Sequence, residues 1–213
     1  MSVHNVTVQG WYRVPDARLK AVLFDLDKTL ADWPPFLQHI GMILRNAGED
    51  VPRRPGDLGG TFPRGLGWFE DWMRRTQAPG YKPEQRVLDM LAMLEAAGVP
   101  WGIVTNGTRW QHVKLVNMGI HPEPECLVIS KESGHEKPDP EIFAEALRRL
   151  GGPRPSEALF VGDNPRMDIQ GASNAGLNTA WVRRGRVWRW GAPEPDFTID
   201  HVDEVPGIIG IQS

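Results

Sequence analysis

Short apolar runs alternate along the chain with segments of helical periodicity. The first run, residues 21–24, contains only apolar side chains, as expected of a strand buried on both faces of a parallel sheet. Similar runs predict strands at residues 101–104, 127–129, 158–161 and 179–182, with an edge strand at 197–200. Helical spacing predicts helices at residues 84–97, 109–118, 140–150 and 166–175, and a short helix near 202–209. This alternation predicts a Rossmann-like α/β fold in three layers, α/β/α, with helices on both faces of a parallel sheet.

Residues 31–82 interrupt this alternation. The segment is rich in proline and glycine, and only two short stretches of it have a helical pattern. Long irregular stretches are uncommon in compact domains and often serve as lids. We therefore expect residues 33–81 to form a small, mostly helical cap after the first strand, with residues 1–32 and 82–213 forming the core. The alternative is a surface excursion without a role in function.

Composition narrows the class of protein. The chain has 213 residues and a formal net charge of −3, which allows one large domain or one domain with a small insert. This charge lacks the basic character of nucleic-acid-binding domains, so we expect no nucleic-acid partner. Cys126 is the single cysteine, and no apolar segment approaches the ~20 residues that span a bilayer. We see no secretion signal, and we expect a cytoplasmic monomer or homodimer without a membrane partner.

Asp25 and Asp27 directly follow the first predicted strand. Side chains two residues apart leave the same face of an extended chain, so the two carboxylates are expected to converge. At about 4 Å and an effective dielectric constant of about 20 they would repel by about 4 kcal/mol, which a divalent cation would offset. Hard oxygen ligands suit Mg²⁺. The alternative is a capping turn, where aspartate is favoured because it hydrogen-bonds to the backbone.

A second acidic pair follows the predicted strand at 158–161. Asp163 stands at the strand end after Gly162, and Asp168 lies in the first turn of the next predicted helix. Attraction of negative charge to a helix N-terminus would explain Asp168 by itself, but not acidic residues at two strand ends. Because the carboxyl ends of parallel strands share one edge of a sheet, the two pairs are expected to meet there as a metal site.

Two further features offer groups that bind an anion. Thr105, Asn106 and Gly107 follow the strand at 101–104 and supply a hydroxyl and backbone N–H groups in front of a helix. The alternative is a simple helix cap. Lys137 lies just before the helix at 140–150, and the alternative for it is a solvated surface lysine.

Together these features resemble the haloacid dehalogenase-like (HAD) superfamily of phosphohydrolases. Its four motifs occur in the family's order, as Asp25-Leu26-Asp27-Lys28-Thr29, Thr105-Asn106-Gly107, Lys137 within Glu136-Lys137-Pro138-Asp139-Pro140, and Gly162-Asp163 with Asp168. The resemblance covers residues 20 to about 205 apart from the insert. One such motif is a weak signal, whereas four in register on a βα scaffold are specific. The resemblance implies the HAD fold, a Mg²⁺ cofactor and phosphatase activity.

The resemblance also implies roles for the acidic residues. Asp25 would attack phosphorus and form an aspartyl-phosphate, and Asp27 would protonate the leaving alcohol and then activate water. Mg²⁺ would be bound by Asp25 and by the backbone carbonyl of Asp27. Asp163 would be the second side-chain ligand, and Asp168 would bind through water or support the other ligands. Which of these last two binds directly stays open.

The remaining motif residues would bind phosphate. The resemblance implies that Thr105 and the amides of Asn106 and Gly107 hold the phosphoryl oxygens. Lys137 would neutralise charge on the nucleophile and on the phosphoryl group. Lys28 departs from the family pattern, in which a small residue often occupies that place.

Arg64 and Trp68, in the predicted cap, are candidate contacts for the substrate. Arg64 would reach a second anionic group, and Trp68 would line an apolar pocket. The alternatives are a solvated arginine and a tryptophan that packs the cap on the core. The basic and aromatic segment at 183–190 has a composition that could contact nucleic acid, but a solvated loop or dimer contact is the preferred interpretation.

Asp27 favours phosphate esters over halides as substrates. The dehalogenating branch of the superfamily, as the resemblance implies, lacks an acid at this position, because halide leaves without a proton. We therefore expect hydrolysis of a small-molecule phosphate monoester. The alternatives are a phosphotransferase or mutase with the same intermediate, and a phosphate-binding relative without turnover.

Overall fold

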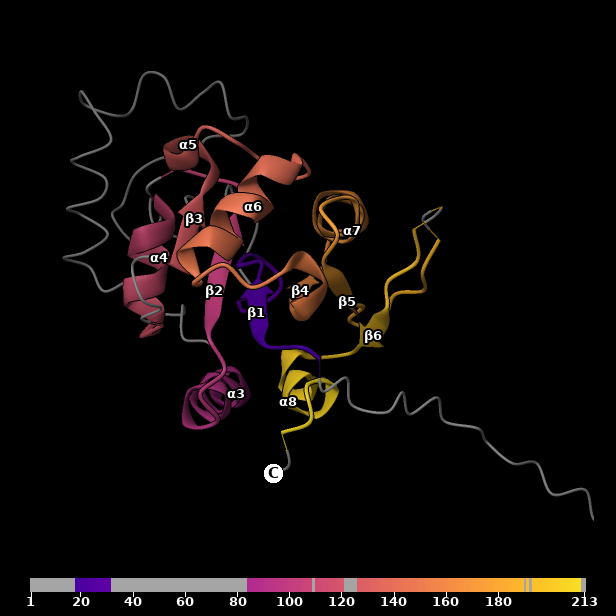
Figure 1. The fold of residues 1–213 in the computed structure, drawn as a ribbon. Coiled ribbons are helices and arrows are strands. Elements are labelled where there is room, and N and C mark those ends of the chain that lie inside the picture. The colour runs from indigo at the N-terminus through magenta and orange to yellow at the C-terminus, as the bar shows by residue number, and fades with distance from the viewer. Residues whose placement is uncertain are drawn as a thin grey trace, which may run out of the picture.

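The computed structural model describes residues 18–31, 84–108, 110–120, 126–189, 191 and 193–211 (Figure 1). Within them the strands are β1 (Ala21–Phe24), β2 (Trp101–Thr105), β3 (Leu127–Ile129), β4 (Ala158–Gly162), β5 (Asn178–Val182) and β6 (Phe197–Ile199). The α-helices are α3 (Gln85–Ala96), α4 (Trp110–Met118), α5 (Ser130–Ser133), α6 (Pro140–Arg149), α7 (Gly171–Asn174) and α8 (Val205–Ile208). The other helical elements are the 3-10 turns η3 (Pro155–Glu157) and η5 (Val202–Glu204) and the π-helical segment η4 (Pro165–Gln170).

The strands form one parallel sheet in the order β3-β2-β1-β4-β5-β6, which confirms the predicted fold class. The first strand is central: Leu23 of β1 pairs with Gly102 of β2 on one side and with Phe160 of β4 on the other. The strand order therefore reverses at β1. In doubly wound sheets ligands bind at the carboxyl ends of the strands beside such a reversal.

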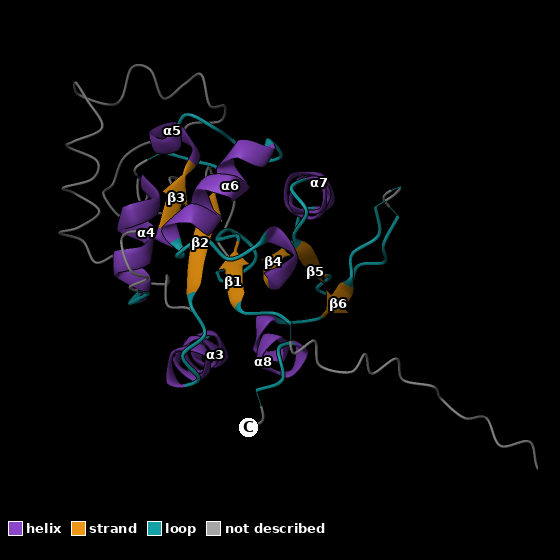
Figure 2. Ribbon diagram, viewed as in Figure 1, coloured by secondary structure: helices purple, strands orange, loops and turns teal. Residues whose placement is uncertain are grey.

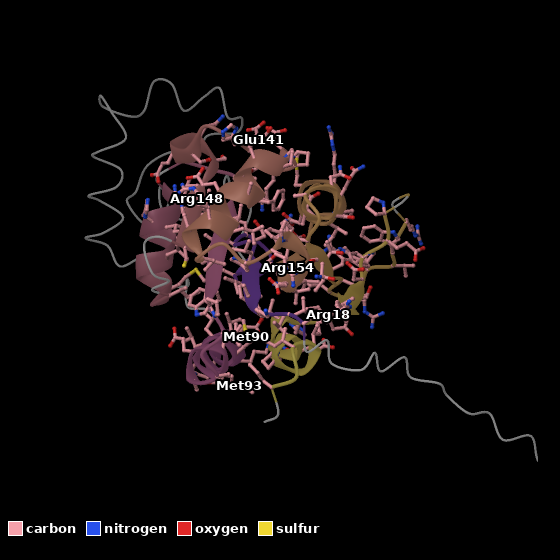
Figure 3. The ribbon with its side chains drawn as sticks, in the orientation of Figure 1. Arg18, Met90, Met93, Glu141, Arg148 and Arg154 are labelled. Carbon is pink, nitrogen blue, oxygen red and sulfur yellow. The ribbon has the colours of Figure 1, made fainter. Side chains whose placement is uncertain are left out.

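Alternate residues of β1, β2, β3 and β4 enter two separate hydrophobic cores. In β1, Val22 and Phe24 pack in the core that includes α3, α4 and α8, whereas Ala21 and Leu23 pack in the core that includes α6 and α7. Figure 2 shows α3 and α8 on one side of the sheet and α6 and α7 on the other. Met90 of α3, labelled in Figure 3, is fully buried in the first core. These two cores give the predicted three layers.

The helix predicted at 166–175 consists of two elements. The segment η4 is a π-helix, and α7 follows it directly. Asn164 begins η4, where its Oδ1 accepts hydrogen bonds from the N–H groups of Arg166 (3.0 Å) and Met167 (3.1 Å). The wider π turn begins two residues after Asp163 and carries Asp168, and π turns are frequent at functional sites.

The predicted cap lies outside the described residues. Residues 33–81, with Arg64 and Trp68, are therefore not compared with the structure, and the domain boundaries stay predictions. Within the described ranges, the structure contains no helix that is long and apolar enough to cross a bilayer.

Candidate active site

The carboxyl ends of β1, β2 and β4 bring residues from all four sequence motifs together. Asp25 follows β1, and its N–H donates to the carbonyl of Val161 in β4 (2.9 Å). Thr105 is the last residue of β2, and Asp163 follows β4. Lys137 reaches the same place from the loop before α6.

Lys137 bridges two carboxylates at the centre of this site. Its Nζ donates to Oδ1 of Asp25 (2.6 Å) and to Oδ1 of Asp168 (2.8 Å), and it lies 5.5 Å from the ring centroid of Phe160. The Lys137 side chain is only 3% exposed. This burial excludes the solvated surface lysine that the sequence had left open.

Burial and charge both shift the pKa values of this bridge. Burial alone would lower the pKa of Lys137, but the carboxylates of Asp168 and Asp25 outweigh it, so the pKa of Lys137 is raised. Burial raises the pKa of Asp25, the Lys137 ammonium opposes that rise and Asp168 adds to it, and this pKa stands at about 7. Burial is therefore the largest cause of the raised pKa of Asp25, and the neighbouring Asp168 carboxylate adds to it.

The turn after β1 holds Asp25 by its second oxygen. The buried Thr29 donates from Oγ1 to Oδ2 of Asp25 (3.2 Å). Lys28 has a left-handed φ of 64°, a conformation that is strained for a residue with a side chain, and its N–H donates to the carbonyl of Ala31 (2.7 Å). With Lys137 on Oδ1 and Thr29 on Oδ2, both oxygens of the Asp25 carboxylate have hydrogen-bond donors.

Three of the predicted acidic residues have the geometry of a metal site. Asp25, Asp163 and Asp168 are buried, and each places one carboxylate oxygen within 4.8 Å of the others. Burial and then the Asp168 charge raise the pKa of Asp163, while Arg186 and Lys28 oppose that rise. A buried set of hard oxygen ligands with excess negative charge fits Mg²⁺.

Gly162 makes the approach of Asp168 possible. A Cβ at position 162 would lie 2.5 Å from the Asp168 carboxylate, which is far inside van der Waals contact. Asp168 accepts hydrogen bonds on both oxygens, from Lys137 on Oδ1 and from the N–H of Asn164 on Oδ2 (2.9 Å). For Asp163, the side-chain donor among the described residues is Arg186, on Oδ2 (3.2 Å). The two carboxylates are therefore not equivalent.

Asp27 is not part of the group of close carboxylates, which consists of Asp25, Asp163 and Asp168. Its carboxylate is held by residues of helix α4. Lys114 donates to Oδ1 of Asp27 (2.6 Å), and Nε2 of Gln111 donates to Oδ2 (3.0 Å). Gln111 also donates to the Thr105 hydroxyl (2.7 Å), so it connects two motifs. Gln111 and Lys114 were not predicted from the sequence. Their spacing of three residues on the helix after Gly107 was the available signal.

Asn106 and Gly107 have structural partners in this arrangement. The Asn106 side chain accepts from the Lys137 N–H (2.8 Å) and donates to the Lys137 carbonyl (2.9 Å), which fixes the backbone that carries the bridging lysine. The Gly107 N–H donates to Oγ of Ser130 (3.0 Å). Asn106 therefore positions Lys137, a function that its place in the sequence did not indicate.

The chain is similar in sequence to known hydrolases and phosphatases. A family model described as haloacid dehalogenase-like hydrolase matches residues 76–176. The chain is 42% identical over 135 residues to a glyceraldehyde 3-phosphate phosphatase from Methanopyrus kandleri, across 60% of this chain and 57% of that relative. It is 32% identical over 220 residues to an N-acetylmuramic acid 6-phosphate phosphatase from Pseudomonas aeruginosa, across 90% of this chain and 95% of that relative.

Solved structures share the fold. A HAD phosphatase from Thermococcus onnurineus superposes with a TM-score of 0.68 at 24% identity, covering 90% of this chain and 98% of that one. A HAD hydrolase from Bacillus subtilis bound to magnesium gives a TM-score of 0.65 at 20% identity, covering 91% and 100%.

Proposed function

The chain belongs to the haloacid dehalogenase-like hydrolases and is a phosphomonoesterase of that family, and on this premise we propose that it hydrolyses a small-molecule phosphate monoester through an aspartyl-phosphate on Asp25. The geometry of Asp25 carries the proposal. Its buried carboxylate is bonded to Lys137 and Thr29, beside the oxygens of Asp163 and Asp168. A carboxylate oriented in this way is a suitable nucleophile for an anionic phosphoryl group whose charge Lys137 and a bound Mg²⁺ would neutralise.

The reaction has two steps. In the first, an Asp25 oxygen bonds to phosphorus while the bond from phosphorus to the alcohol oxygen breaks, and Asp27 gives the alcohol its proton. In the second, Asp27 takes a proton from water, whose oxygen bonds to phosphorus as the bond to Asp25 breaks. The hydrogen bonds from Gln111 and Lys114 hold the Asp27 carboxylate in place for both transfers.

Asp25, Asp163 and the backbone carbonyl of Asp27 would hold the magnesium ion, which supplies positive charge for the phosphoryl group when bound. Of Asp163 and Asp168, Asp163 is the better second side-chain ligand, because its side chain accepts a hydrogen bond on Oδ2 whereas Asp168 accepts one on each oxygen. An oxygen of Asp25 that binds the ion would share or give up its present hydrogen bond from Lys137 or Thr29. Asp168 would act through water and through its contact with Lys137. The magnesium bound by the related fold from Bacillus subtilis supports the choice of metal.

Lys137, the Thr105 hydroxyl and the amides of Asn106 and Gly107 would hold the phosphoryl oxygens. The two hydrogen bonds between the Asn106 side chain and the Lys137 backbone keep Lys137 within reach of both the nucleophile and the incoming anion. At Gly107 a phosphoryl oxygen would share or replace the hydrogen bond to Ser130.

A panel of phosphate monoesters tests this function. Purified protein with Mg²⁺ is expected to release inorganic phosphate from at least one of glyceraldehyde 3-phosphate, N-acetylmuramic acid 6-phosphate, phosphoserine and pyrimidine 5'-nucleotides, the esters in the names of its relatives. Chelation with EDTA should abolish that release, and added Mg²⁺ should restore it. Release from none of the esters, or transfer of phosphate to an added alcohol in preference to water, would overturn the proposal.

Replacing Asp27 with asparagine tests its role as the acid. We expect kcat/KM for an alkyl phosphate to fall by about 10²–10⁴-fold, because the alkoxide then leaves without a proton. For p-nitrophenyl phosphate the fall should be much smaller, since p-nitrophenolate is a stable leaving group and kcat/KM covers only the steps up to its release. Equal losses on the two esters would contradict a proton transfer from Asp27.

A further inference from the structure

Arg186 connects the segment after β5 to the proposed metal site. Its guanidinium donates to the backbone carbonyl of Asp163 (3.0 Å), to Oδ2 of the same residue (3.2 Å) and to the carbonyl of Val182 (2.9 Å). Its Nε donates to the carbonyl of Arg183 (2.9 Å), which fixes the plane of the guanidinium. The composition of this segment had favoured a solvated loop or a dimer contact.

A tryptophan pair supports the same contact. Nε1 of Trp181 also donates to the Asp163 carbonyl (3.0 Å), and the Arg186 guanidinium lies 5.5 Å from the Trp181 ring centroid. Trp181 itself packs edge-to-face against Trp188, with the ring centroids 5.0 Å apart. Asp163 is therefore held both by its main chain and by one side-chain oxygen.

We propose that Arg186 is a positioning residue that restricts Asp163 to one-oxygen binding of the divalent cation, and that it thereby favours Mg²⁺ over Ca²⁺. The proposal rests on the proposed function, in which Asp163 is a direct ligand. A carboxylate often binds Ca²⁺ through both oxygens, because Ca²⁺ accepts six to eight ligands at flexible angles. Mg²⁺ requires octahedral geometry and suits one oxygen from each carboxylate. Arg186 occupies Oδ2 and leaves Oδ1 for the ion.

The exposure of Arg186 makes it a good target for substitution. Its side chain is 45% exposed, so a methionine at this position is not forced into the core. Arg186→Met is therefore expected to fold, and its thermal unfolding without metal is compared with that of the parent. Arg183→Met is the matched control, because it removes the same charge from the same segment, where Arg183 pairs with Asp200 at the surface.

Titration of the intact protein with MgCl₂ and with CaCl₂, followed by calorimetry, tests the proposal. The ratio of the Ca²⁺ to the Mg²⁺ dissociation constant is expected to fall by about tenfold in Arg186→Met and to stay within about twofold in Arg183→Met. A loss of charge acts on both dications alike and cancels in this ratio. Arg186→Lys keeps the charge without the planar fork, and it should also lower the ratio.

Each result has a definite meaning. A parental ratio in both Arg186→Met and Arg186→Lys, with Mg²⁺ bound by the parent, would overturn the role of Arg186 and leave the phosphatase proposal standing. If the parent binds neither cation, the metal site of the proposed function is wrong, and this inference fails with it. An equal fall in Arg183→Met would show that the ratio does not depend on the contact between Arg186 and Asp163, and it would also overturn the proposal.

Discussion

Asp25→Asn is expected to lower phosphatase turnover by at least about 10³-fold, because an amide cannot attack phosphorus to form the aspartyl intermediate. Asparagine has nearly the shape of aspartate and retains an oxygen that can accept a hydrogen bond from Lys137 or Thr29, the two donors of the parent carboxylate. The variant should therefore fold, with a thermal midpoint within about 5 °C of the parent. Steady-state release of inorganic phosphate, measured with Mg²⁺ on the best ester of the panel, gives the answer.

Asp89→Asn is the control for this experiment. Asp89 lies exposed on α3, where it accepts a hydrogen bond from Gln85. Its substitution makes the same chemical change as Asp25→Asn, but outside the site. Its turnover should stay within about twofold of the parent, as expected of a surface substitution. Turnover of Asp25→Asn within tenfold of the parent would exclude the covalent mechanism, since an amide in place of the nucleophile cannot form the aspartyl-phosphate.

Lys137→Met is expected to reduce both stability and activity. The substitution leaves the buried carboxylates of Asp25 and Asp168 without the cation that they share, and breaking a buried ion pair in this way costs about 3–5 kcal/mol. Turnover should fall by about 10²–10³-fold even where the variant is folded, because the phosphoryl group loses its charged donor. Urea unfolding without metal measures the first effect, and phosphate release with Mg²⁺ measures the second.

Lys20→Met is the control for Lys137→Met, because it removes a positive charge from an exposed side chain instead of a buried one. Lys20 precedes β1 and pairs with Glu157 at 2.8 Å, but its side chain is 64% exposed. Glu157 also pairs with Arg154, which is labelled in Figure 3. This control should lose less than about 1 kcal/mol of unfolding free energy and keep its turnover. A similarly small loss in Lys137→Met would contradict the bridging role inferred for that lysine.

The sequence was sufficient for the fold because each strand carries its own signal. Residues of β1 are apolar at every position, since even and odd positions enter different cores, and only a sheet covered on both faces requires this. The predicted strand limits agree with the structure to within about one residue. The helix after Asp163 was less well predicted, because a π turn and an α-helix of the same sequence differ only in their hydrogen bonds.

The candidate site was predictable where its residues stand at strand ends. The side chains of Asp25, Thr105 and Asp163 lie at one edge of the sheet because parallel strands end there, and the strand order follows from packing. The sequence could not give the direction of each side chain. Asp27 was expected beside Asp25, but its carboxylate is bonded to α4, since Lys114 and Gln111 are the donors within its reach.

By itself, the sequence determined the parallel sheet, the four motifs and the class of chemistry, because these depend on residue types and on their spacing along the chain. Only the tertiary structure decided which groups meet. Lys137 and Asp25 are 112 residues apart and share a hydrogen bond of 2.6 Å. Arg186 and Asp163 are 23 residues apart and meet through the turn after β5. Such contacts depend on loop paths and rotamers that packing selects, and no local pattern in the sequence encodes them.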